Sequence, residues 1–550
     1  MGKNRKVLLV RAPERRLSVI QQLYTPYESL GLGYIAAFLR QHGHEITIID
    51  GAIQKLSIEQ TVEEIKNHSF DLIGFTVPSG IVYPQTIEIA HEIRKNNQDV
   101  PICFGGHHAT LVHRKILEDF PKDQRVVVVR GEGEYTSLEL VENIDNIPSY
   151  QHILGLTWCS GDEIIENPSR PFIQDLDSLP FPARDHLETV LANGGEVVIT
   201  ASRGCYFKCR FCSIHAFYNH TRRTRSARNV MEEIKEIQNL YQCRNFWFID
   251  DDFFVPKTKG NQIACEIFDL IIQEGLSIEF DLFCRATDVD RDTFRLASQA
   301  GLRNAMIGVE SGVQRILNFY YKGITVKRNK EAVRIVEDAG ANAIVEFIMF
   351  DPWMSLQEVE ENLSFLKEIH KYNPYNLSSK LIILAHTPLY DDIKAGKTEP
   401  LPPISAEKVR ELSESYKNFY LFYEFQDAYV KSLFQIITQA WRWIEPIEYE
   451  LAQLENAIRI HGGTAESQEY YEQLQKLVNE SALDIFEKTL AGVKILNPMD
   501  EEAVKLCQED AEHEAHNLSI FIVSIVKREI EIIQNQSMRT QKPTLTGEQI

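Results

Sequence analysis

Three cysteines stand close together in the middle of the chain, in residues 202–213, Ser-Arg-Gly-Cys-Tyr-Phe-Lys-Cys-Arg-Phe-Cys-Ser. The C-x3-C-x2-C spacing of Cys205, Cys209 and Cys212 supplies three thiolates from one short loop. A four-iron cluster normally takes four cysteine ligands, one per iron, so three cysteines leave one iron free to hold a small molecule. The spacing therefore predicts a reactive iron–sulfur site rather than a structural one.

A structural zinc site is the competing interpretation of the same cysteines. Such sites usually bring two close ligand pairs, and this chain has no second C-x2-C pair. His215 or His220 would have to complete a knuckle of three cysteines and one histidine. The apolar run 197–200 before the loop indicates a buried strand. The C-terminal end of such a strand is where α/β barrels place their chemistry.

The loop resembles that of the radical S-adenosylmethionine (SAM) enzymes, and Phe211 matches the family's usual aromatic residue before the last cysteine. The resemblance implies that the three cysteines bind a [4Fe-4S] cluster, whose fourth iron is chelated by the amine and carboxylate of SAM. In that family one electron from the reduced cluster cleaves SAM to a 5′-deoxyadenosyl radical, which abstracts a substrate hydrogen. An electron donor such as a flavodoxin or a ferredoxin is therefore implied as a partner.

The overall composition is that of a soluble, acidic protein. A chain of 550 residues predicts two to four domains. No apolar run approaches the ~20 residues of a membrane span, and no signal sequence is recognisable at the start. We therefore expect a cytoplasmic protein with no membrane partner, and its nine cysteines are expected to be reduced. The net charge of −21 argues against nucleic acid as a partner, and the basic stretch 222–225 is expected to be a solvated or substrate-facing loop.

Before the cysteine loop, short apolar runs alternate with amphipathic stretches, which predicts a doubly wound, mostly parallel, Rossmann-like sheet. The expected strands are 6–10, 45–50, 71–77, 101–106 and 125–130, and the expected helices are 33–42, 58–67, 84–95, 111–117 and 135–143. Such a sheet binds ligands beyond the carboxyl ends of its strands, where this chain has glycine-containing turns. No G-x-G-x-x-G follows the first strand, so a nicotinamide-type site is not indicated.

The order of these turns resembles the cobalamin (B12)-binding domain that precedes the barrel in a large class of radical SAM methyltransferases, class B. The Gly-Gly-x-His-Ala-Thr and Arg-Gly-Glu-Gly-Glu motifs of that class stand here at 105–110 and 130–134. The resemblance implies a cobalamin-type site at Ser79, Gly105, Gly106, His107, Gly131 and Glu132. The Asp-x-His-x-x-Gly motif that supplies a lower axial histidine in other cobalamin proteins is missing. Some radical SAM relatives bind cobalamin without it and others bind none. His107 and His108 could be metal ligands or hydrogen-bonding loop residues.

A second strand–helix series begins at residue 197 and has six units, as in the partial (β/α)6 barrel of the radical SAM fold. The expected strands are 197–200, 245–250, 278–284, 305–310, 343–350 and 380–385, and the expected helices are 227–241, 259–274, 293–300, 327–339 and 356–372. Charged groups at strand ends are costly to bury unless they are paired or bind a ligand. Together with the resemblance, this makes six residues candidates for SAM contacts: Phe211, Asp250, Asp251, Arg285, Glu310 and Ser311. The alternative for the charged ones is a salt-bridge network at the barrel mouth. The segment 350–352, Phe-Asp-Pro, departs from the family's Gly-x-Pro, and His386 replaces a glycine.

After about residue 400 the sequence becomes helical in period, at 405–430, 433–443, 448–460, 467–491 and 501–534. The aromatic residues of the first stretch are expected to pack on the barrel, with a substrate groove as the alternative. The predicted α/β organisation is a Rossmann-like domain over 1–145, a proline-rich connector over 146–192 and a partial barrel over 193–400. A helical domain over 401–537 and a disordered tail over 538–550 follow.

The leading hypothesis is a cobalamin-dependent radical SAM C-methyltransferase that acts on a peptide or natural-product intermediate. The first alternative is a cobalamin-independent radical SAM enzyme, such as a ribosomal-peptide epimerase, a dehydratase or a rearrangement enzyme. Epimerisation requires a hydrogen donor, for which Cys284 and Cys507 are candidates, although a lone cysteine is usually a small buried hydrophobe. A non-catalytic metal-binding scaffold is the remaining alternative, and the six-unit repeat argues against it.

Overall fold

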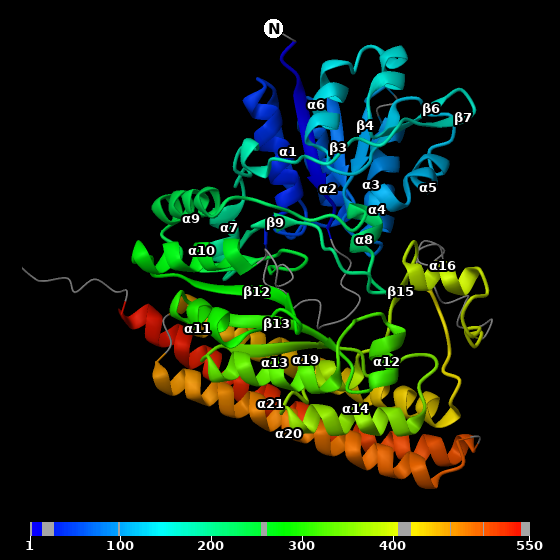
Figure 1. The fold of residues 1–550 in the computed structure, drawn as a ribbon, viewed down its shortest axis with the longest axis vertical. Coiled ribbons are helices and arrows are strands. Elements are labelled where there is room, and N and C mark those ends of the chain that lie inside the picture. Colours follow the sequence, from blue (N-terminus) through cyan, green and yellow to red (C-terminus); the bar gives the residue numbers. More distant parts are fainter. Residues whose placement is uncertain are drawn as a thin grey trace, which may run out of the picture.

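The computed structural model describes residues 3–13, 27–96, 99–254, 261–404, 420–461, 464–498 and 500–540. Two β-sheets and a set of long helices form successive layers (Figure 1). The N-terminal sheet, blue to cyan, lies above a second sheet, green, and the C-terminal helices, orange to red, lie below both. The cysteine loop therefore lies between the two sheets, because its flanking elements β9 and α8 are found there.

The N-terminal sheet has seven strands in the order β2-β1-β3-β4-β5-β6-β7. Its five parallel strands confirm the expected ones: β1 (Lys6–Arg11), β2 (Glu45–Asp50), β3 (Leu72–Thr76), β4 (Ile102–Gly105) and β5 (Val126–Val129). The helices are α1 (Leu30–Gln41), α2 (Ile58–Lys66), α3 (Tyr83–Asn96), α4 (His107–Leu111), α5 (His113–Glu118) and α6 (Glu134–Glu142). Each face of the sheet has its own apolar core. Helices α1 and α6 pack on one face, and α2, α3 and α5 pack on the other. The sheet is therefore doubly wound, as predicted.

The expected connector contributes two further strands to this sheet, β6 (Leu156–Ser160) and β7 (Glu163–Glu166). Both pair antiparallel, β6 with β5 and β7 with β6. Trp158 of β6 is buried edge-to-face against Tyr150, in a short 3-10 turn (Ile147–His152). Helix α7 (Leu187–Ala192) then leads to the second sheet.

The second sheet has five parallel strands in the order β14-β13-β12-β11-β8. They are β8 (Val197–Ile199), β11 (Asn245–Phe248), β12 (Glu279–Arg285), β13 (Leu302–Glu310) and β14 (Asn342–Phe347), which confirms five of the six expected strands. The sixth is reduced to one parallel bridge between Phe350 and Lys380. Pro352 follows shortly after Phe350 and has no N–H to continue a ladder. Strand β15 (Ile383–Leu384) pairs instead antiparallel with β16 (Tyr420–Leu421), so no closed barrel forms within the described ranges.

The two faces of the second sheet differ in what covers them. One face packs on α9 (Ala227–Tyr241), α10 (Asn261–Gln273), α11 (Arg291–Gln299), α13 (Val326–Asp338) and α14 (Leu356–Glu368) through an apolar core. Because successive side chains of a strand alternate between faces, the residues between those core positions point the other way. We call that side the inner face; on β12, β13 and β14 it carries Phe283, Arg285, Met306, Gly308, Ile344 and Glu346.

The C-terminal region consists of α19 (Ala428–His461), α20 (Ala465–Ile495) and α21 (Glu501–Thr540). Two expected helices, 433–443 and 448–460, are one continuous helix that contains Pro446. The expected helix 405–430 is wrong where it can be compared, because residues 420–421 form β16 and α19 begins at Ala428; residues 405–419 lie outside the described ranges. The same applies to residues 541–550 of the expected tail, whereas residues 538–540 belong to α21. None of the described helices combines the length and apolar character needed to cross a bilayer.

Candidate active site between the two sheets

The entry of the cysteine loop is fixed by two carboxylates at the end of β11. The loop runs from β9 (Ser202–Arg203) to α8 (Ile214–Tyr218). Asp250 accepts hydrogen bonds from the Ala201 N–H (3.1 Å) and from the Ser202 hydroxyl. Asp251 accepts one from the Gly204 N–H (3.1 Å). Both carboxylates were expected to contact SAM, and in this structure they hold the loop backbone.

Gly204 is required where it stands. Its φ is +89°, and a Cβ on this residue would lie 2.2 Å from the Thr221 carbonyl oxygen. Any other residue would therefore be both strained and in steric conflict. The loop can start in this conformation only with glycine directly before Cys205.

The sulfur of Cys209 has a cationic neighbour on the second sheet. Arg285 donates a hydrogen bond from Nη1 to Cys209 Sγ (3.1 Å), and its guanidinium carbon lies 3.5 Å from the centroid of the Phe207 ring. Burial raises the pKa of Cys205 to about 11 and that of Cys212 to about 12. Both thiols therefore favour the protonated form unless a metal centre compensates the thiolate charge.

The donor set fits a cluster better than a single ion. Among the described residues no group of three or more His, Cys, Asp or Glu is arranged to hold one metal ion. His215 and His220 stack on each other at 5.1 Å, and His215 Nε2 lies 3.2 Å from the Cys209 carbonyl oxygen. The zinc-knuckle alternative is therefore not formed. A four-iron cluster needs only one thiolate at each of three irons, which the loop can provide.

The remaining SAM candidates lie at the carboxyl edge of the second sheet or beside it. Glu310 is paired with Lys322 (2.9 Å), and its φ of +64° is unusual for a residue with a side chain. The Ser311 hydroxyl donates to Asn362 Oδ1 (2.9 Å). Phe211 packs edge-to-face on Tyr320. The structure thus brings Arg285 to the cysteine loop, while Glu310 and Ser311 have partners of their own.

A cavity of about 330 Å³ lies between the N-terminal sheet and the cysteine loop. Five of the six expected cobalamin-type residues line it, Gly105, Gly106, His107, Gly131 and Glu132, and Ser79 does not. The part of the chain from the end of β8 onward contributes Thr200, Ser202, Arg203, Phe217, Tyr218, Ile249 and Asp251 to the wall.

Glycine at these strand ends has a specific reason. Gly106 has a φ of +103°, and a Cβ there would lie 3.1 Å from Thr76 Oγ1 and from the Val77 carbonyl oxygen. Two further lining glycines, Gly105 and Gly131, also leave their backbones uncovered by side chains. The cavity is a glycine-walled cradle at the carboxyl ends of parallel strands, where this type of sheet binds its ligands.

The two histidines of the 105–110 motif point in different directions. The His107 ring stacks on Phe217 at 4.6 Å, and its buried Nε2 has no hydrogen-bond partner among the residues described. Burial lowers the pKa of His107 to about 4, so the ring is neutral at physiological pH. His108 instead packs edge-to-face on Tyr83, next to Gly80. Only His107 therefore faces the cavity.

Four charged residues, of which Glu132, Glu134 and Arg223 are buried and Arg203 is largely buried, tie the cavity wall to the cysteine loop. Arg203 donates from Nη1 to Glu132 (3.1 Å) and from Nη2 to Glu134 (2.7 Å), and Arg223 donates to the other oxygen of Glu132 (2.7 Å). We call this set the interdomain clasp. It corrects the expectation for the basic stretch 222–225, because Arg223 and Arg225 are buried in ion pairs. These two glutamates and their arginine partners are 69 to 91 residues apart, so nothing in the sequence indicated that they pair.

The two hydrogen-donor candidates are not brought to the cysteine loop. Cys284 precedes Arg285 on β12 and points to the opposite face, into the helix-packed core. Burial raises the pKa of its thiol. Cys507 lies on α21, with its sulfur against Gly492 of α20.

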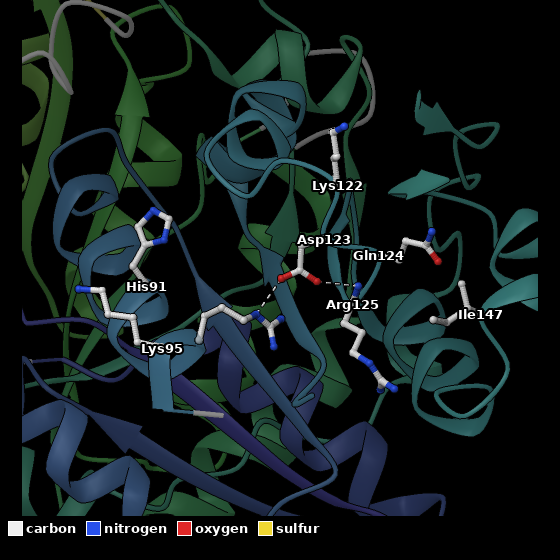
Figure 2. A pocket seen from close by; sticks show the side chains of 8 residues that line it. His91, Lys95, Lys122, Asp123, Gln124, Arg125 and Ile147 are labelled. Atoms are coloured by element: carbon white, nitrogen blue, oxygen red, sulfur yellow. Dashed lines mark hydrogen bonds and ion pairs between the residues drawn. The ribbon is translucent and has the colours of Figure 1, made fainter. Parts of the chain in front are cut away.

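A second depression of about 630 Å³ lies on the N-terminal sheet, away from the cysteines. Figure 2 shows its lining side chains around Asp123. This carboxylate forms an ion pair with Arg94 and accepts a hydrogen bond from the Arg125 N–H. The lining residues come from the end of α3 and the segment before β5, at the amino ends of the strands. This depression is therefore at the opposite end of the sheet from the glycine-walled cavity.

Comparison with known proteins agrees with this division of the chain. The family model "B12 binding domain" matches residues 17–141, and "Radical SAM superfamily" matches residues 199–366. The uncharacterized methyltransferase PH0819 of Pyrococcus horikoshii is 31% identical over 66% of this chain and 78% of its own length. The anaerobic magnesium-protoporphyrin IX monomethyl ester cyclase of Cereibacter sphaeroides is 30% identical over 58% of this chain, which spans about half (53%) of that relative.

The fold is also found in a solved structure, that of the cobalamin-dependent S-adenosylmethionine radical enzyme OxsB with aqua-cobalamin and S-adenosylmethionine bound. The TM-score is 0.72, with 19% sequence identity over 98% of this chain and 80% of that one. The likeness covers both sheets and the C-terminal helices, and at this level of identity it concerns the fold.

Proposed function

Because the chain belongs to the radical SAM enzymes that carry a B12-binding domain, we propose that it is a cobalamin-dependent methyltransferase that methylates a carbon atom of its substrate. The single observation that carries this proposal is the cavity whose wall joins the strand-end glycines of the N-terminal sheet to the start of the cysteine loop. The methyltransferase relative at 31% identity supports it further.

The residues have separate roles in this proposal. Cys205, Cys209 and Cys212 hold the [4Fe-4S] cluster, and the glycine-walled cavity holds the cobalamin. When bound, these groups and SAM supply a 5′-deoxyadenosyl radical and a transferable methyl group. The protein contributes binding, orientation and exclusion of water.

Positioning depends on the contacts around the loop. Asp250 and Asp251 fix its entry, and Arg285 places a permanent positive charge against Cys209. That guanidinium lies within hydrogen-bonding distance of the sulfur, so it would partly balance the negative charge of a cluster held there. A flavodoxin or ferredoxin is the proposed electron donor.

The substrate class in this proposal is a peptide or natural-product intermediate. A specific observation favours a second candidate, radical ring closure, because one relative at 30% identity is a cyclase. Epimerisation has less support, since neither Cys284 nor Cys507 lies beside the cysteine loop.

Anaerobic purification followed by iron, sulfide and SAM-cleavage measurements tests the radical part. We expect about four irons and four sulfides per chain, with 5′-deoxyadenosine formed on reduction. Cys209→Ser should abolish both, and Cys507→Ser, the matched control, should change neither. Zinc in place of iron and sulfide would overturn the assignment.

A further inference from the structure

Glu346 is a carboxylate on the inner face that has no partner among the residues the structure describes. It lies near the carboxyl end of β14, in register with Gly308 of β13. It forms no hydrogen bond or ion pair with any residue that the structure describes, whereas its neighbour Glu310 is paired with Lys322 (2.9 Å). A partly buried carboxylate normally has a partner, because leaving it without one is costly. Such a group at a strand end is a candidate for ligand binding.

The surroundings of Glu346 are mainly apolar. Met306 and Ile344 are paired in register on the inner face, and Phe283 lies opposite Met306 on β12. Ile344 is 37% exposed although it is a large apolar residue. On β11, the Trp247 ring lies beside Phe283 at 5.8 Å and closes this apolar surface on the side away from Glu346. The inner face therefore combines an apolar bed with one unmatched acceptor, which is typical of a small-molecule site.

The position of Glu346 relative to the cysteine loop follows from strand register. Arg285, Gly308 and Glu346 are aligned across β12, β13 and β14. Neighbouring strands lie about 4.8 Å apart, so the backbone of Glu346 is about 10 Å from that of Arg285. The Arg285 guanidinium in turn contacts Cys209. A molecule of moderate size bound at Glu346 can therefore reach the space next to the loop.

The charges that face Glu346 favour a cation. Burial, and secondarily Glu310, raise the pKa of Glu346 to about 7, because its negative charge is poorly compensated. The nearby Lys322 is occupied by Glu310, and Arg285 is occupied by Cys209 and the Lys322 carbonyl. Asp281, at the other end of the inner face, is satisfied by Arg303 and Asn304.

We infer that the inner face is the substrate site and that Glu346 selects a substrate with a protonated amine, or a comparable N–H donor, on an apolar body. This inference rests on the proposed function and adds the chemical class of the substrate. Glu346 acts here as a specificity-determining residue that forms an ion pair with the substrate, and the apolar residues around it bind the substrate body.

Ligand binding without turnover tests this inference independently of the reaction. The probes are 4-phenylbutylamine and its neutral analogue 4-phenylbutanol, titrated into the full-length protein at pH 8 and monitored by saturation-transfer NMR. We expect the amine to bind about tenfold more tightly than the alcohol. Glu346→Gln should remove that preference, and Glu361→Gln, on the exposed side of α14, should retain it.

A second variant separates loss of the site from loss of folding. Ile344→Lys places a protein cation beside Glu346 and should abolish the amine preference while leaving alcohol binding within about threefold. Equal affinities in the unchanged protein, or an amine preference that survives Glu346→Gln, would overturn the inference. Loss of SAM cleavage in Glu346→Gln, restored by more SAM, would assign the carboxylate to SAM and also overturn it. Failure of the unchanged protein to cleave SAM would concern only the proposed function.

Discussion

The interdomain clasp should control how readily the cysteine loop opens, and Arg203→Met tests this directly. Glu134 is 3% exposed, and Arg203 is its hydrogen-bonding partner among the residues described. The substitution leaves this carboxylate buried and unpaired, while Glu132 keeps Arg223. Removing one partner of a buried ion pair typically costs about 3–5 kcal/mol. If the whole of this cost lowers the free energy of local opening of the cysteine loop, amide exchange in the loop should accelerate by roughly two to three and a half powers of ten.

Hydrogen exchange measured on peptides that span residues 202–213 is the appropriate assay. Peptides from α21 should be unaffected, because in Figure 1 that helix lies below the second sheet, whereas α6 and β9, which carry Glu134 and Arg203, lie above it. Arg291→Met is a matched control, since its ion pair with Asp338 is largely exposed and should contribute little. Adding Glu134→Gln to Arg203→Met should recover part of the protection, because it removes the stranded charge. Unchanged loop exchange in Arg203→Met would refute the clasp as a restraint on the loop.

Three further predictions concern the cavity, the inner face and the cluster. Gly106→Ala forces a side chain into a backbone with φ of +103° and should weaken cobalamin binding at least tenfold in equilibrium dialysis. The control Gly275→Ala, at a positive φ with open space around it, should not change cobalamin binding. Binding of 4-phenylbutylamine should weaken about tenfold from pH 8 to pH 6. The pKa of Glu346 is raised to about 7, so the carboxylate becomes protonated over this range and loses the charge that pairs with the amine. An affinity that does not change with pH would contradict this. Arg285→Met removes the hydrogen bond to Cys209 Sγ. It should lower the cluster's midpoint potential in an EPR-monitored titration without changing the iron content. An unchanged potential would show that the contact is absent once the cluster is bound.

Most strands could be predicted from the sequence because they are uninterrupted apolar runs at the right length. The N-terminal strands and five of the second sheet appear where such runs stand. Strands β6 and β7 were missed because polar residues interrupt or flank their apolar positions and because they lie in a proline-containing segment. The continuity of α19 through Pro446 was also missed. Ile444 and Ile447 on either side of it are fully buried, so tertiary packing outweighs the local cost of proline.

The residues of the candidate site could be predicted only where they stand close together in the sequence. The three cysteines and the glycine turns lie within short stretches, so their spacing was enough to indicate a cluster site and a ligand-binding strand end. Asp250 and Asp251 were expected at the strand end, but whether a carboxylate there binds a ligand or a backbone N–H depends on three-dimensional contacts. Glu346 gave no signal, because its isolation from other charges becomes visible only through the register of β13 and β14.

In the proposed function, the glycine-walled cavity and the cysteine loop form one active site. A cobalamin titration of anaerobically reconstituted protein, with SAM cleavage followed in the same sample, tests this most directly. We predict one equivalent of bound cobalamin per chain together with 5′-deoxyadenosine formation. Formation of 5′-deoxyadenosine with no cobalamin bound at saturating supply would contradict the claim.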